Sequence, residues 1–169
     1  PAAAAPDPVK QADAPKNIFS LLAPVFGIIL FASIFNNILR CFMPPIDFDA
    51  LSYHLAVPRQ YLLAGKIIEL PTILYSNFPL AAEMMFLPGL AANAPASGAL
   101  IHTAFGIMTA ALIYTWMKIH FSSETALLGA AIFYLTPLVG IVSPVAMVDL
   151  TVTFYSFAAI AALLAPGGE

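Results

Sequence analysis

Two carboxylates, a phenol and an imidazole lie close together in residues 47–54, which read DFDALSYH. If a helix begins at Asp49, Tyr53 lies four residues further on and shares its face. His54 follows, and its ring can turn toward a neighbouring site. Carboxylates and imidazoles are the usual general bases of proteins, and Asp47 adds a second acid. The alternative interpretation makes Asp49 the N-cap of that helix and Asp47 a solvated loop residue.

Three further charged residues are candidates for binding a substrate. Arg59 could clamp a phosphate through its planar guanidinium, or extend to lipid head groups. Glu83 lies in a strongly apolar segment, where an ionised carboxylate needs a partner. Asp149 stands at the start of an apolar stretch, which it could also cap. His102 is expected to be a hydrogen-bonded packing residue, and no metal ligand set is predicted.

The composition excludes a water-soluble enzyme. Hydrophobic side chains make up 61% of the 169 residues and charged ones only 9%, whereas an ordinary soluble domain carries about a quarter charged residues. The net charge of −3 and the lack of any Lys/Arg run also exclude nucleic acid as a partner. The sequence therefore predicts an all-α integral membrane protein whose main partner is the lipid bilayer.

Long uncharged stretches predict where the chain crosses the membrane, because a bilayer core about 30 Å thick needs about 20 apolar helical residues. The chain is expected to span it four times, at about residues 18–39, 99–119, 125–142 and 146–164. Residues 1–17 are rich in Ala and Pro and are predicted to be a disordered tail. Residues 165–169 form a second short tail. Together these segments describe one transmembrane helical module between two tails.

The charged stretch between the first two spans is predicted to hold interfacial helices at about 49–64 and 79–93. Gly65 supplies a stop signal for the first of them. The second contains Glu83 and a Pro-Gly pair and is expected to lie half-buried, although a full crossing would give five spans. With four spans, Lys10, Lys16 and Lys118 lie on one side, which the positive-inside rule makes cytoplasmic. The N-terminus is then cytoplasmic and the first large loop extracytoplasmic.

Several strings in this loop resemble the first extracytoplasmic loop of bacterial membrane glycosyltransferases of the GT-C fold, relatives of protein O-mannosyltransferases and aminoarabinose transferases. They are FDALSYHLAVPRQY at 48–61, GKI at 65–67 and SNFPLAAEM at 76–84. The similarity continues through ALLGAA at 126–131 and TPL at 136–138 to VDL at 148–150. It implies a protein of the bacterial inner membrane. Family members are much longer, so the chain is expected to be their N-terminal part or a shortened relative.

The resemblance implies a reaction and a set of roles. A sugar would pass from a polyprenyl-phosphate carrier to an acceptor on the outer face, with Asp49 as general base. Arg59 and His54 would neutralise the departing lipid phosphate, and Glu83 and Asp149 would orient sugar hydroxyls, or a divalent cation if one is used. Asp47 and Tyr53 complete the predicted substrate-binding set. No other cofactor is implied.

Two other functions are consistent with the composition. The chain could be a non-catalytic subunit that stabilises a larger respiratory or photosynthetic membrane complex, with other membrane subunits on its apolar faces. Asp49 and Asp149 would then be helix caps or interface contacts. An ion-coupled transporter needs ionisable groups at mid-bilayer depth, and only Glu83 and His102 are candidates, so it ranks last.

Overall fold

Two long apolar stretches fold into the two longest helices. In the computed structural model, which describes residues 18–164, helix α1 covers Ile18–Arg40 and helix α4 covers Ala96–Met117. With a rise of about 1.5 Å per residue, helices of this length match a bilayer core about 30 Å thick. Among residues 18–164 these two are long and apolar enough to cross a membrane, and they coincide with the predicted spans 18–39 and 99–119. The described chain is all-helical, without a strand.

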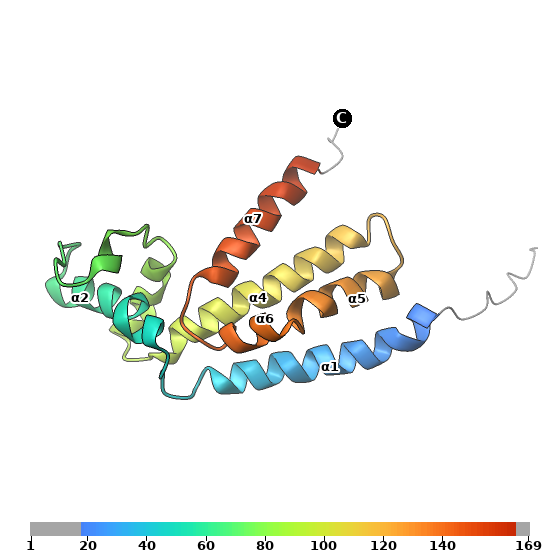
Figure 1. Cartoon of the computed structure of the whole chain (residues 1–169), viewed down its shortest axis with the longest axis horizontal. Helices are drawn as coiled ribbons and strands as arrows, with labels where there is room; N and C mark the ends of the chain where they lie inside the picture. The colour runs from blue at the N-terminus through green and yellow to red at the C-terminus, as the bar shows by residue number, and fades with distance from the viewer. Residues whose placement is uncertain (1–17, 165–169) are drawn as a thin grey trace, which may run out of the picture.

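The span predicted at 125–142 is not a single helix. That stretch forms two helices, α5 (Ser123–Tyr134) and α6 (Pro137–Val142), with a break between them. Pro137 is the physical reason, because its ring and its missing N–H disrupt a helix that continues through it but suit the first turn of a new one. α5 packs against α4, and α6 continues from α5 toward the cap (Figure 1).

Helix α7 covers Asp149–Leu164, so it begins three residues later than predicted and has 16 residues. It packs against α4 and then diverges from the bundle (Figure 1). At about 1.5 Å per residue its described part is shorter than a bilayer core. Four or five full spans are therefore not established by helix length, and α1 and α4 are the two that meet the requirement.

Residues 41–95, which we call the cap, join α1 to α4 and contain only short elements. A π-helical turn, η1 (Ala50–His54), precedes α2 (Ala56–Ala64), and 3-10 turns η2 (Leu74–Asn77) and η3 (Glu83–Phe86) precede α3 (Leu87–Ala91). The helix predicted at 49–64 is present but irregular: residues 50–54 are π-helical and Leu55 is a turn residue before α2. A regular α-helix would press the Pro58 ring against the His54 carbonyl. Starting α2 at Ala56 puts Pro58 in the first turn, where its missing N–H is not needed.

Two other predictions about the cap have clear outcomes. Gly65 does end α2, in the left-handed conformation with φ 65°. Between residues 79 and 93 the structure contains only η3 and the five-residue α3, which is much too short to cross a bilayer. The predicted helix at 79–93 is thus reduced to two short pieces.

Helix α4 is the centre of the packing, since it contacts α1, α5 and α7. Phe105 of α4, Tyr134 of α5 and Leu150 of α7 share one buried cluster. Buried polar groups pair within it, with Thr103 Oγ1 donating to the Ser143 carbonyl at 2.7 Å and Tyr134 within hydrogen-bond distance of Ser143 Oγ at 3.3 Å. Hydrogen bonds of this kind offset the hydration that polar groups lose in an apolar interior.

A second buried cluster attaches the cap to the bundle. It joins Ala50 and Leu55, around the π-helical turn, to Phe86 and Ala146. Gly98 of α4 allows this close approach, because a Cβ there would lie 3.0 Å from the Ala146 Cβ and 3.1 Å from Leu55. The cap residues and the α6–α7 loop are therefore held next to each other at one end of α4.

Candidate functional site

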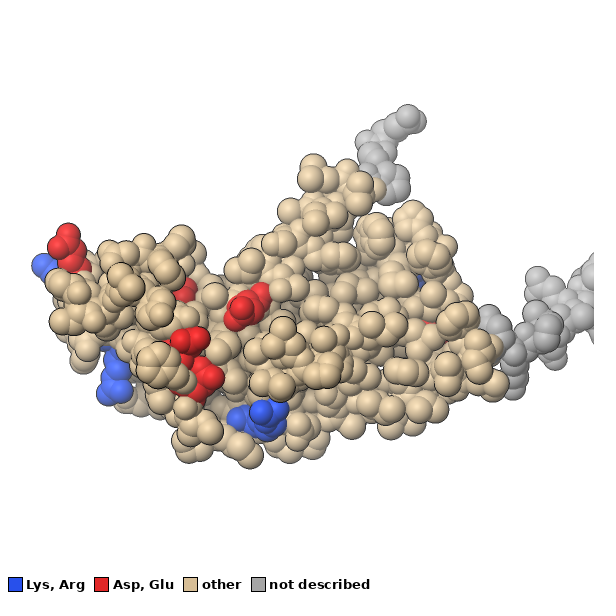
Figure 2. Space-filling model, viewed as in Figure 1, with Lys and Arg blue, Asp and Glu red and all other residues tan. Residues whose placement is uncertain are grey.

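Most of the predicted site residues line one cavity between the cap and the start of α7. The cavity has a volume of about 570 Å³. Five of its lining residues were singled out from the sequence: Asp49, Tyr53, His54, Glu83 and Asp149. We call it the acidic cavity, because three carboxylates and no Lys or Arg line it. Acidic side chains gather at this end of the molecule, and few are visible along the helices (Figure 2).

His54 and Glu83 form a buried pair in this cavity. The Nδ1 atom of His54 lies 2.9 Å from Oε1 of Glu83, and their side chains are only 6% and 3% exposed. The pair links the π-helical turn to η3, two segments that are separated by the whole of α2. Glu83 Oε2 is also buried and has no hydrogen-bond partner among the described residues. The sequence indicated that Glu83 needs a partner, and the structure supplies one for a single oxygen.

An aromatic cluster forms one wall. The Tyr53 ring stacks on Tyr75 with centroids 4.5 Å apart and contacts the His54 ring at 4.0 Å, and Tyr75 meets Phe78 edge-on. Burial, and next the negative charge of Asp49, raise the pKa of the Tyr53 phenol above its usual value. Tyr53 therefore stays a neutral hydrogen-bond donor. Neither Tyr75 nor Phe78 was predicted from the sequence as part of this cluster, although Phe78 lies within the SNFPLAAEM string and Tyr75 directly precedes it.

His102 holds the end of α7 in position. Its Nδ1 lies 3.2 Å from the Val142 carbonyl at the end of α6, and its Nε2 accepts from the Leu150 N–H at 3.0 Å. With Nε2 as acceptor, Nδ1 carries the proton and donates to Val142. This agrees with the prediction of a hydrogen-bonded packing residue. The contact also fixes the residue next to Asp149, a positioning role that spacing alone could not reveal.

The acidic residues near α7 and the π-helical turn differ in what they do locally. Asp149 is exposed and begins α7, whereas Asp49 is half-buried at the cavity edge. Asp49 makes no capping hydrogen bond, so the N-cap interpretation is wrong. Asp47 has that task instead, since its Oδ1 accepts from the backbone N–H groups of Asp49 and Ala50 at 3.0 and 3.2 Å. The Asp49 carboxylate is thereby left available to a ligand.

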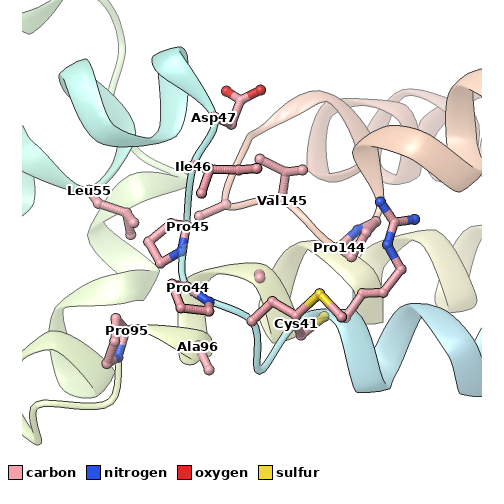
Figure 3. A pocket seen from close by; sticks show the side chains of 14 residues that line it. Cys41, Pro44, Pro45, Ile46, Asp47, Leu55, Pro95, Ala96, Pro144 and Val145 are labelled. Carbon is pink, nitrogen blue, oxygen red and sulfur yellow. The ribbon is translucent and has the colours of Figure 1, made fainter.

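Two predicted site residues lie elsewhere. Asp47 lines a smaller, mostly apolar cavity of about 140 Å³ among Pro44, Pro45 and Val145 (Figure 3). Arg59 is exposed and lines another pocket with residues of α2, α3 and the 93–95 turn. The structure therefore does not bring Arg59 to the three carboxylates. Its predicted role came from the phosphate-binding chemistry of arginine and from the GT-C resemblance, and neither fixes its distance from Asp49.

An apolar groove continues from the acidic cavity along α7. The acidic cavity and the groove share Pro79, Val148 and Val152 as lining residues. Met85 and Tyr155 are among the residues that line the groove alone. A cavity with three carboxylates that opens into an apolar groove matches the shape of an amphiphile with a polar head and a hydrocarbon tail. Comparisons of the chain with models of known protein families, with curated proteins and with solved structures give no match.

Proposed function

We propose that this chain is the membrane module of a glycosyltransferase that moves a sugar from a polyprenyl-phosphate carrier to an acceptor hydroxyl. The observation that carries the proposal is the convergence of Asp49, the His54–Glu83 pair and Asp149 on one cavity. These are the residues on which the GT-C resemblance rests, and 100 residues of chain separate the first from the last.

In the proposed reaction the sugar lies in the acidic cavity and the polyprenyl tail in the adjoining groove. The acceptor oxygen attacks the anomeric carbon, the bond from that carbon to the phosphate oxygen breaks, and the lipid phosphate leaves with the electron pair. Asp49 takes the proton of the acceptor hydroxyl as general base. Glu83 and Asp149 accept hydrogen bonds from sugar hydroxyls, and Tyr53 donates one. The lipid phosphate joins the sugar to the tail and therefore lies where the cavity meets the groove, turned away from the carboxylates, which repel an anion.

The proposed location is the bacterial inner membrane, with the cavity on the outer face. The start of α1 and the turn at 118–122 lie at the end of the bundle opposite the cap (Figure 1). This orientation places Lys118 at the cytoplasmic end, but Arg40, Arg59 and Lys66 lie at the cap end, so it rests on the GT-C resemblance and not on the positive-inside rule. Cysteines placed beside Asp47 and Asp149 should both react with an impermeant thiol reagent added from outside. Labelling from opposite sides would contradict this topology.

The reaction is tested by Asp49→Asn in membranes supplied with a polyprenyl-phosphate sugar. Loss of a general base predicts that transfer falls by about 100-fold or more. Glu69→Gln is the matched control, because it removes the same charge from an exposed cap residue outside the cavity and should leave transfer within about twofold. Transfer by Asp49→Asn at the control's rate would refute the catalytic assignment.

A second candidate function is a non-catalytic subunit of a larger membrane complex. The exposed apolar surface of α1 favours this function. Ile28 and Phe31 are each 71% exposed, and a partner helix would cover them as well as lipid does. Co-purification with other membrane proteins in fixed stoichiometry, together with no sugar transfer, would favour this function. A monodisperse chain carrying bound polyprenyl lipid would count against it.

A further inference from the structure

Arg59 has no part in the acidic cavity, although its guanidinium is available to an anion. It is exposed on α2, and among residues 18–164 no carboxylate lies within 4 Å of it. The same holds for Lys66, which follows α2 directly after Gly65. A guanidinium suits a phosphate, because its N–H groups can donate to two phosphate oxygens at once. Two cations of the cap are therefore without a counter-charge from the described chain.

A groove beside Arg59 separates α2 from α3 and the 93–95 turn. It has a volume of about 380 Å³, and none of its lining residues is acidic. Leu62 and Leu63 line it from α2, and Leu90 lines it from α3. Arg59 precedes these two α2 leucines by three and four residues, so all three share one face of the helix. This site, which we call the Arg59 groove, thus combines a cation with apolar surface.

The Arg59 groove lies near the level at which the bilayer core ends. Helix α1 ends at Arg40 and α4 begins at Ala96, and both helices are long enough to cross a membrane. Pro95, which lines the groove, directly precedes α4. Nearby apolar side chains are open to the surroundings, with Leu63 74% and Ile67 75% exposed. Exposed apolar residues beside cations are typical of a surface that lies among lipid head groups.

We propose that the Arg59 groove binds an anionic phospholipid of the surrounding bilayer. The guanidinium of Arg59 donates to the lipid phosphate, and an acyl chain lies against Leu62 and Leu63. Charge complementarity selects an anionic lipid over a zwitterionic one, because phosphatidylcholine carries its own ammonium, whereas Arg59 and Lys66 supply the positive charge that phosphatidylglycerol lacks. This site is independent of the acidic cavity and of any sugar transfer.

The test places a photo-crosslinking benzoylphenylalanine at residue 63 of the full chain, in nanodiscs of equal phosphatidylglycerol and phosphatidylcholine. Mass spectrometry then identifies the lipid that illumination attaches. At low salt, phosphatidylglycerol adducts should exceed phosphatidylcholine adducts about fivefold, the effect of one basic residue at an anionic surface. Added salt should reduce this ratio. The same crosslinker in place of Ile132, an exposed residue of α5, samples lipid beside the bundle and should capture both lipids equally.

Variants assign the preference to Arg59. Arg59→Gln should abolish the preference at residue 63, whereas Lys118→Gln, an equal charge change at the opposite end of α4, should leave it at about fivefold. Equal capture of the two lipids by the unaltered chain, or the same ratio in Arg59→Gln and Lys118→Gln, would overturn the proposal. Lipid adducts at residue 132 without any at residue 63 would also overturn it, since the groove would then face water or protein. If Arg59→Gln does not fold, the salt series and the comparison of residues 63 and 132 decide.

Discussion

Replacing His102 by leucine should destabilise the fold, because one imidazole serves two buried backbone groups. Nδ1 donates to the Val142 carbonyl and Nε2 accepts from the Leu150 N–H, and the ring is completely buried. Each backbone group left without a partner costs about 1–3 kcal/mol. Burial of the leucine side chain offsets about 1.5–3 kcal/mol of that loss. Two such groups lose about 2–6 kcal/mol, so the expected net loss is about 0.5–3 kcal/mol.

The free energy of unfolding can be measured by circular dichroism in mixed micelles of mild and denaturing detergent. His120→Leu is the matched control, because His120 is exposed in the turn after α4 and should change stability by less than about 0.5 kcal/mol. His102→Gln should lose less than His102→Leu, since an amide can both donate to a carbonyl and accept from an N–H. If His102→Leu is as stable as His120→Leu, the two hydrogen bonds do not hold α6 and α7 together.

Three further predictions follow from the cap and its neighbours. Gly65→Ala should lower the unfolding free energy by about 1 kcal/mol through backbone strain at φ 65°. No clash adds to this loss, because a Cβ at residue 65 meets nothing within 4 Å. Gly140→Ala is the control: its site is also open but helical, so it should be neutral or stabilising in the same assay. Asp47→Ala should lower the unfolding free energy by about 1 kcal/mol, because its carboxylate no longer accepts from the Asp49 and Ala50 N–H groups. Asp49→Ala should lower it by less than half as much. Equal losses would contradict the assignment of Asp47 as the cap. The raised pKa of Tyr53 favours the neutral phenol in the folded state. The stabilisation of the folded state by the Tyr53 phenol is therefore complete below the usual phenol pKa of about 10. It is lost as the pH rises through the pKa of Tyr53 in the folded protein. Unfolding measured between pH 9 and 12 should show a shallower loss for Tyr53→Phe.

The residue types predicted where the site lies better than they predicted its geometry. Asp49, His54, Glu83 and Asp149 were chosen from the sequence because ionisable groups are rare in so apolar a chain. Tyr53 was chosen because it shares a helical face with Asp49. The assignment of their local roles was less accurate. Asp47 and Asp49 are chemically alike, and only the path of the backbone decides which of them reaches the N–H groups of the turn.

Proline positions explain most of the differences in the fold. The apolar content of 125–142 predicted one helix, and Pro137 divides it into α5 and α6. Pro58 similarly separates the π-helical turn from α2. Both residues are visible in the sequence, but a proline permits either a kink or a new first turn. The packing of the surrounding helices selects between the two.

The sequence by itself determined that the protein is helical and apolar, with α1 and α4 as long helices and the charged groups concentrated between them. These properties depend on composition and local spacing, which any reader of the chain can see. Only the tertiary structure decided that Glu83 faces His54, that Asp149 joins them from the far end of the chain and that Arg59 does not. Such contacts join residues tens of positions apart, and they arise from how α4 packs against α7 and against the cap.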